Sequence, residues 1–274
     1  MYNTIYYVLG GMFALIGFLA LYQFIQAVRF SRSNTKQVFT ATIVLVMFAR
    51  GAFFLITPSI VSGSLQNFPL NVLLLWDHMI DMLFFLAYFM FFLSWTDFYY
   101  QASVGSESNF FKNRIVVIVL SSFYVGSVIA ITGCFLMSNN PDTVKTVELV
   151  TACFITSLYF MTAGLFAVYG LKINRLMNDC RLLIKNVQST KVKAITWICS
   201  LCFLLRACLI VYSIILLNNE PESKTFNLAW YWVLIFFVVL EILPTCAMLY
   251  YLSKGQQNSS SRTESTYMAI QQEE

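Results

Sequence analysis

Six ionisable residues lie inside long apolar stretches of the chain, where a charge is costly to bury. They are Arg50, Asp77, His78, Asp81, Arg206 and Glu241. Because such groups face a bundle interior and pair with one another, we expect them to contact each other rather than lipid. Asp77 and Asp81 are four residues apart, which puts both carboxylates on one helix face. The sequence predicts an Arg50–Asp81 or Arg50–Asp77 pair, and a second pair between Arg206 and Glu241.

Two kinds of chemistry suit these charges. They act as structural clamps that hold the helices together, or they form a proton or ion path or a polar ligand site. A metal site is not expected, because His78 is the only histidine and points about 100° away from Asp77 on a helix. No set of nucleophile, base and metal ligands is recognisable, so we expect neither an enzyme nor a cofactor.

The elements that carry these residues are seven apolar stretches, expected to be helices that cross a membrane. The chain is 59% hydrophobic and 11% charged, which excludes an ordinary soluble domain. We predict an all-α, polytopic seven-transmembrane helix bundle over residues 1–252, followed by a disordered tail at 253–274. The predicted helices lie at roughly 5–28, 38–57, 71–101, 115–137, 147–171, 194–217 and 227–252.

The basic residues predict the orientation of this bundle. Thirteen of the seventeen Lys and Arg residues fall in alternate connections and in the tail. Basic residues in short loops stay on the cytosolic side, so the N-terminus is expected to be luminal or extracellular and the C-terminus cytosolic. The net charge of +4 is explained by attraction to anionic lipid and indicates no nucleic-acid partner.

Further signals lie at the ends of the predicted helices. Pro244 is expected to kink the last helix, because it lacks an amide hydrogen. Residues 171–187 carry apolar side chains at helical spacing, so the fifth helix either continues past the membrane or an amphipathic segment lies on the headgroups. Tyr267 and Ile270 form a Tyr-x-x-apolar run of the kind that clathrin adaptors read as a sorting signal.

Three stretches resemble one family of seven-helix membrane proteins, the tobamovirus multiplication protein (THH/TOM) family. Residues 92–102 read FLSWTDFYYQA, residues 198–208 read ICSLCFLLRAC, and residues 240–245 read LEILPT. The first stretch contributes the family-like residues Trp95, Asp97, Tyr99 and Gln101. Arg50 and Asp81 also stand where the family tends to carry such residues. Trp95 and Tyr99 have a simpler role as well, since aromatic rings anchor helix ends at the interface.

The resemblance implies a non-enzymatic protein of lysosomal, vacuolar or endosomal membranes. Plant members of the family support viral replication complexes together with a small Arf-like GTPase, and animal relatives are linked to Rag GTPases. We therefore expect a membrane scaffold or regulator that recruits a cytosolic small GTPase or adaptor protein. The plasma membrane is the alternative location. Two other functions stay open: a ligand sensor resembling a G-protein-coupled receptor, with its polar site at Arg50, Asp77 and Asp81, and a transporter using Arg206 and Glu241.

Overall fold

The computed structural model describes residues 2–30, 34–62, 68–104, 114–138, 140–179, 186–219 and 233–250 of the 274. The elements of these residues are helices, and no strand occurs among them. They are α1 (Tyr2–Phe30), α2 (Asn34–Val61), α3 (Leu70–Val104), α4 (Arg114–Met137), α5 (Pro141–Asp179), α6 (Asn186–Asn219) and η2 (Ile235–Ile242). The last, η2, is a π-helical stretch inside a helix that covers residues 233–250.

Five helices are long and apolar enough to cross a membrane, and each contains one of the stretches predicted from the sequence. These spans are Asn3–Arg29, Gln37–Ile60, Asn71–Leu93, Pro141–Arg175 and Ala194–Ile215. The other two predicted spans correspond to shorter apolar helices, Ser121–Met137 and Ile235–Tyr250. The all-α class and the apolar spans are confirmed. A count of seven crossings stays a prediction, as does the division at residue 252, since residues 251–274 lie outside the described part.

The helices α5 and α6 extend beyond their predicted bounds. The fifth predicted span ends at 171, whereas α5 continues without interruption to Asp179. Of the two interpretations of residues 171–187, a continuing helix is therefore the one observed as far as Asp179. Similarly, α6 begins at Asn186, eight residues before its predicted span. In both cases the hydropathy marks only the oily part of a helix, because the backbone ladder continues into polar sequence.

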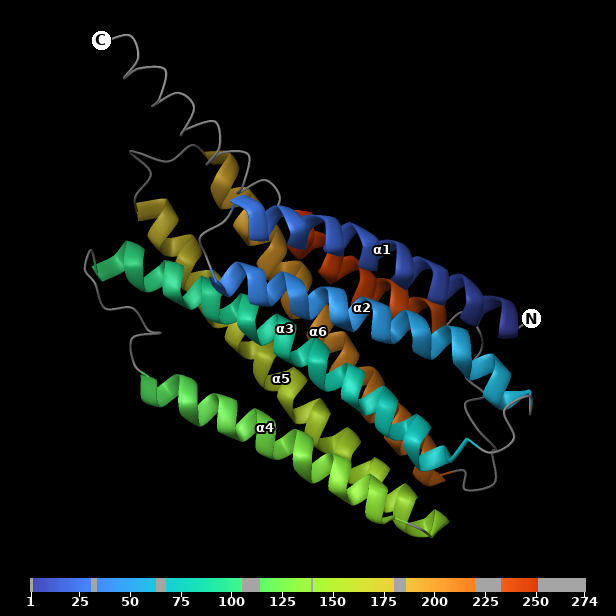
Figure 1. The fold of residues 1–274 in the computed structure, drawn as a ribbon. Coiled ribbons are helices and arrows are strands. Elements are labelled where there is room, and N and C mark those ends of the chain that lie inside the picture. Colours follow the sequence, from blue (N-terminus) through green and yellow to red (C-terminus); the bar gives the residue numbers. More distant parts are fainter. Residues whose placement is uncertain are drawn as a thin grey trace, which may run out of the picture.

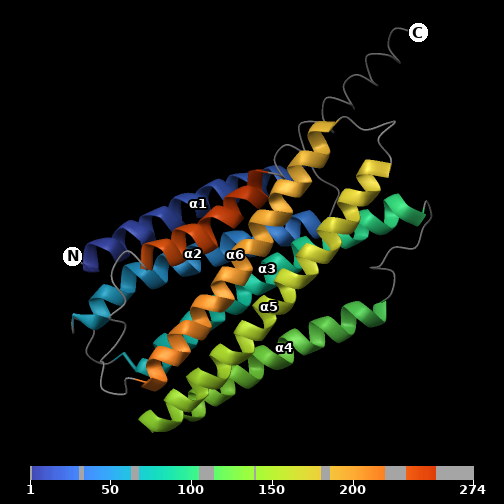
Figure 2. The same ribbon diagram turned by 180° about the vertical axis from the view of Figure 1, so that it is seen from behind.

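The bundle is organised around α3, which packs against α2, α4 and α5. On one side α1 covers α2 and also contacts η2, and α6 joins α5 to η2. Successive helices run in alternating directions (Figures 1 and 2). As a result, five helix termini lie together at one end of the bundle, here called the Leu70 end: Tyr2, Val61, Leu70, Pro141 and Asn219. Phe30 and Val104 lie at the opposite, Phe30 end.

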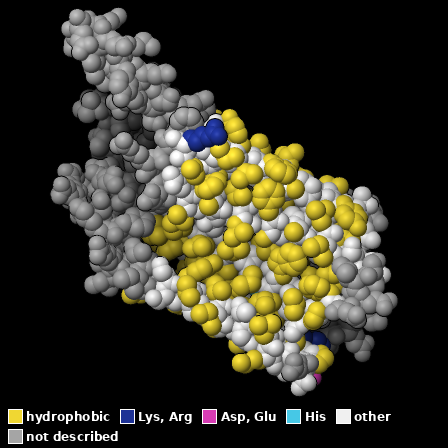
Figure 3. All heavy atoms as spheres, in the orientation of Figure 1, with side chains coloured by type: hydrophobic (Ala, Val, Ile, Leu, Met, Phe, Trp, Pro, Cys, Tyr) yellow, Lys and Arg dark blue, Asp and Glu magenta, His cyan; other side chains and the backbone are white. Residues whose placement is uncertain are grey.

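The surface is apolar and part of the interior is charged, the reverse of a soluble protein. Large apolar side chains are exposed along α1, among them Leu15 and Phe18, each 63% exposed. Figure 3 shows apolar side chains covering most of the described part of the visible face. Arg50, Arg206 and Glu241 are at most 1% exposed. Lipid favours this arrangement, because apolar groups face hydrocarbon without cost while buried charges need partners.

Candidate functional site

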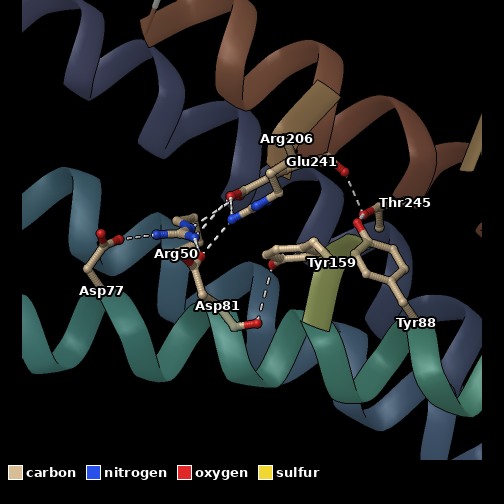
Figure 4. Close-up of polar contacts among 8 residues, drawn as sticks. All are labelled: Arg50, Asp77, Asp81, Tyr88, Tyr159, Arg206, Glu241 and Thr245. Carbon is tan, nitrogen blue, oxygen red and sulfur yellow. Dashed lines mark hydrogen bonds and ion pairs between the residues drawn. The ribbon is translucent and has the colours of Figure 1, made fainter. Parts of the chain in front are cut away.

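Arg50 on α2 is the centre of the polar interior. Its Nη1 contacts Oδ1 of Asp77 and its Nη2 contacts Oδ1 of Asp81, both on α3. Its Nε donates to Oε2 of Glu241 at 3.2 Å, and Nη2 lies 2.9 Å from Oε1 of the same carboxylate. One guanidinium therefore joins three carboxylates from two further elements (Figure 4). The planar fork of arginine, with five N–H donors, suits this role.

Arg206 on α6 closes the network. Its Nη2 donates to Oδ1 of Asp81 at 2.6 Å and lies 2.7 Å from Oε1 of Glu241. Asp81 and Glu241 are each shared by both arginines, whereas Asp77 forms an ion pair with Arg50 alone among the described residues. The pairs expected from the sequence thus form one ionic network that connects α2, α3, α6 and η2.

The two predicted pairs are joined to each other, because Arg50 of the first pair directly contacts Glu241 of the second. The residues expected for a receptor site and those expected for a transporter therefore belong to one network.

The sequence of this chain is similar to that of known proteins. The family model described as the THH1/TOM1/TOM3 domain matches residues 1–270. The chain belongs to the THH1/TOM1/TOM3 family. It is 27% identical over 268 residues to Tobamovirus multiplication protein 1 of Arabidopsis thaliana, covering 92% of this chain and 84% of the relative. No solved structure matches the chain. Family membership and five apolar helices together identify a multi-pass integral membrane protein.

Two of the three sequence stretches that resemble the THH1/TOM1/TOM3 family each supply a member of the network. Residues 198–208 contain Arg206 and residues 240–245 contain Glu241. The third stretch, residues 92–102, lies in the last turns of α3, near the Phe30 end. The side chains of Trp95, Asp97, Tyr99 and Gln101 are outside the described part of the chain, and so are Tyr267 and Ile270.

Aromatic rings surround both guanidinium groups in this THH1/TOM1/TOM3 chain. The guanidinium carbon of Arg206 lies 4.8 Å from the ring centroid of Tyr159, 5.2 Å from that of Phe236 and 5.6 Å from that of Phe84. Among the residues that the structure describes, its buried Nε and Nη1 have no hydrogen-bond partner. Ring faces attract a cation at these distances, so they partly replace the missing acceptors. Arg50 lies 5.3 Å from the ring of Phe237 and 5.7 Å from that of Phe84.

Three polar side chains that sequence reasoning missed extend the network. Thr245 donates through Oγ1 to the carbonyl oxygen of Glu241 at 2.7 Å, and its hydroxyl lies 3.4 Å from that of Tyr88. Tyr159 donates to the carbonyl oxygen of Asp81 at 3.5 Å. A signal for Tyr88 was present in the sequence. It follows Asp81 by seven residues and therefore lies on the same face of α3.

Glu241 reaches the two arginines from an irregular helix. In η2 the backbone follows the wider π-helical pattern, and the amide of Leu243 donates to the carbonyl of Val238, five residues earlier. Pro244 follows immediately and has no amide hydrogen to donate, so a regular α-helical ladder cannot continue through it. Single π-helical turns occur often at functional sites. The kink predicted at Pro244 stays a prediction.

His78 lies beside the network but outside it. Its ring is mostly buried and packs 5.5 Å from the ring of Phe135 on α4. Its Nδ1 has no hydrogen-bond partner within the described part of the chain. In the part of the chain that the structure describes, no group of three or more His, Cys, Asp or Glu residues is arranged to hold a metal ion. The network can fix the relative positions of four elements, or it can serve as part of a proton or ion path.

Proposed function

We propose that this protein is a non-enzymatic scaffold or regulator of lysosomal, vacuolar or endosomal membranes that recruits a cytosolic small GTPase or adaptor protein. The observation that carries the proposal is family membership along almost the whole chain. The matched plant relative is named for tobamovirus multiplication. For the present chain we infer a corresponding role in assembling other proteins on a membrane.

The architecture of the interior supports a scaffold. All five intramembrane charges of the network are engaged with one another, and the arginines and Glu241 are almost completely buried. Such a network holds four elements in one relative position, which a docking platform requires. Removing one member of a buried ion pair is strongly destabilising, so the arrangement resists rearrangement.

The docking surface that we propose lies at the Phe30 end, which we take to be cytosolic. There α5 carries the exposed Lys172 and Arg175, and α1 carries the exposed Arg29. Lys172 is held near the surface by Tyr169, whose ring centroid lies 5.1 Å from its Nζ. The proposed topology has seven crossings, an N-terminus in the lumen and a C-terminus in the cytosol. It places these basic residues on the cytosolic side, in agreement with the positive-inside rule.

Binding of purified small GTPases to the protein in lipid nanodiscs tests the proposal. The charge-reversal variant Lys172→Glu/Arg175→Glu is expected to weaken binding at least about tenfold, since mutations at charged interface rims reduce association. Lys145→Glu is the matched control, because Lys145 is an exposed lysine of the same helix at the Leu70 end. No binding by Arf-like or Rag-like GTPases, or equal loss in both variants, would contradict the proposal.

A ligand-sensing receptor is the second candidate, and one observation favours it. The side chain of Asp77 is 38% exposed although it contacts the buried Arg50, so the network is open at one edge. A polar ligand arriving from the Leu70 end would meet this carboxylate first. Ligand-dependent changes near Lys172 in the absence of GTPase binding would favour the receptor. Ion flux through proteoliposomes that is lost in Glu241→Gln would instead indicate a transporter.

A further inference from the structure

Arg206 has N–H groups that its ion pairs do not use. Its Nη2 is directed to Asp81 and Glu241. The remaining N–H groups are on Nε and Nη1, and neither nitrogen has a hydrogen-bond partner among the described residues. Arg206 is only 1% exposed, so these donors lie away from the surface of the bundle. Buried donors without an acceptor are costly, and we therefore expect a further partner at this position.

The aromatic rings beside Arg206 do not complete its hydrogen bonds. The ring centroid of Tyr159 lies 4.8 Å from the guanidinium carbon. A ring face at this distance attracts the cation as a whole. Each N–H bond, however, needs an acceptor along its own direction.

Two tyrosine hydroxyl groups provide acceptors nearby. Tyr159 donates its own hydrogen to the carbonyl oxygen of Asp81 at 3.5 Å. Thr245 donates its hydrogen to the carbonyl oxygen of Glu241, so Tyr88 is the donor in the 3.4 Å contact between the hydroxyls of Tyr88 and Thr245. Both phenol oxygens therefore keep lone pairs that can accept a hydrogen bond. Both tyrosines are at most 1% exposed.

The buried donors and the buried acceptors meet at one place. Tyr88 on α3 interacts electrostatically with both Arg206 on α6 and Tyr159 on α5. Figure 4 shows the two tyrosine rings on the side of Arg206 that is opposite to Asp77. Three helices thus enclose a small polar region next to the ionic network.

The chemistry of this region selects its ligand. A cation cannot accept hydrogen bonds from Arg206, and an anion would lie beside Asp81 and Glu241, which already contact the same guanidinium. A water molecule accepts from the guanidinium and donates to the phenol oxygens, and buried waters typically make about three hydrogen bonds to such groups. We propose that Arg206, Tyr88 and Tyr159 bind an ordered water molecule inside the bundle.

The water connects the ionic network to the hydroxyl groups of Tyr88 and Thr245. Tyr88 follows Asp77 by eleven residues, so the connected polar groups extend about 16 Å along α3. This inference depends neither on the proposed partners nor on the orientation of the bundle. Failure to bind a GTPase would leave the water site intact, and a dry interior would leave the scaffold intact.

The experiment uses the full chain in lipid nanodiscs and X-ray hydroxyl-radical labelling measured by mass spectrometry. Radiolysis of a bound water oxidises the side chain beside it, whereas a dry buried side chain stays unlabelled. Tyr88 and Tyr159 are expected to be oxidised although both are buried. Phe13 is the control, because it is 0% exposed and packs on the rings of Phe54 and Phe237. Labelling of the two tyrosines no greater than that of Phe13 would overturn the proposal.

Rapid mixing with water that carries a heavy oxygen isotope distinguishes an enclosed water from bulk solvent. The isotope is expected to enter oxidised Tyr88 more slowly than the exposed Tyr7 of α1. Equal rates would mean that bulk solvent reaches Tyr88, which contradicts an ordered water.

The variant Tyr159→Phe tests the proposed acceptor while keeping the ring beside Arg206. It is expected to reduce the labelling of Tyr88 several-fold, because the water loses one of its partners. Tyr7→Phe is the matched control and is expected to leave the labelling of Tyr88 unchanged. Labelling of Tyr88 that is the same in Tyr159→Phe as in the wild type would refute the site.

Discussion

The contact of α1 with α2 and the contact of α3 with α6 and η2 hold helices together by different means. In the first, backbones approach closely: a Cβ on Gly51 would lie 3.3 Å from the carbonyl oxygen of Gly10. In the second, Asp81, Arg206 and Glu241 join the helices through ion pairs. Lipid is as apolar as the side chains it surrounds, so helices associate there through close packing or polar contacts rather than through the hydrophobic effect.

The two contacts also differ in tolerance. Close packing depends on shape, and a clash can be relieved by a small shift of one helix. An ion-pair network depends on charge, and a buried charge that loses its partner stays uncompensated unless water reaches it. The bundle should therefore be most sensitive at its ionic centre, less sensitive at its glycine contacts, and least sensitive at single neutral hydrogen bonds.

The largest effect is expected from Arg206→Met. It leaves Asp81 and Glu241 with Arg50 alone, and loss of one partner in a buried ion network costs about 3–5 kcal/mol. Thermal unfolding in detergent measures this loss of stability. Adding Glu241→Leu should recover more than half of the loss, because the double variant has the same charge excess as the wild type. A loss equal to that of the exposed control Arg175→Met would contradict the comparison.

An intermediate effect is expected from Gly10→Val. A Cβ there would lie 2.8 Å from two side-chain atoms of Leu55 and 3.3 Å from the carbonyl of Gly51. Overpacking of this kind costs about 1–3 kcal/mol. The adjacent residue provides the control, because a Cβ on Gly11 would meet no atom of the described residues within 4 Å. Gly11→Val should unfold at the wild-type temperature, and equal destabilisation of both variants would show that α1 does not pack through this face.

The smallest effect is expected from Thr245→Val, which removes the hydroxyl near Tyr88. Hydrogen bonds between membrane helices contribute about 0.6 kcal/mol on average. A double-mutant cycle with Tyr88→Phe isolates the contact in the same unfolding assay. A coupling energy as large as the cost of Arg206→Met would mean that neutral bonds, and not ion pairs, hold α3 to the last helix.

Most of the helical layout was predictable because hydrocarbon imposes a simple condition. A backbone in lipid must satisfy its own hydrogen bonds, so a long apolar run is a helix. The spans predicted near residues 38–57 and 71–101 lie inside α2 and α3. The polar extensions of α5 and α6 were not included in the predicted spans, since hydropathy carries no information about helix beyond the oily region.

The site was predictable in composition but not in form. Asp77 and Asp81 share a helix face by spacing alone, and the cost of burial requires that both find cations. That one arginine serves both, and also Glu241, depends on how α2 and η2 approach α3. Tyr159 and Phe236 beside Arg206 come from two other elements and had no signal in the sequence.

The sequence alone determined which segments are apolar helices and which ionisable residues must avoid lipid, because both follow from the free energy of moving groups out of water. The tertiary structure decided the partners. Only the packing of α2, α3, α6 and η2 brings two guanidinium groups and three carboxylates into one network, in which Glu241 belongs to the π-helical stretch η2. Distances between side chains on different helices are set by packing, which no local pattern encodes.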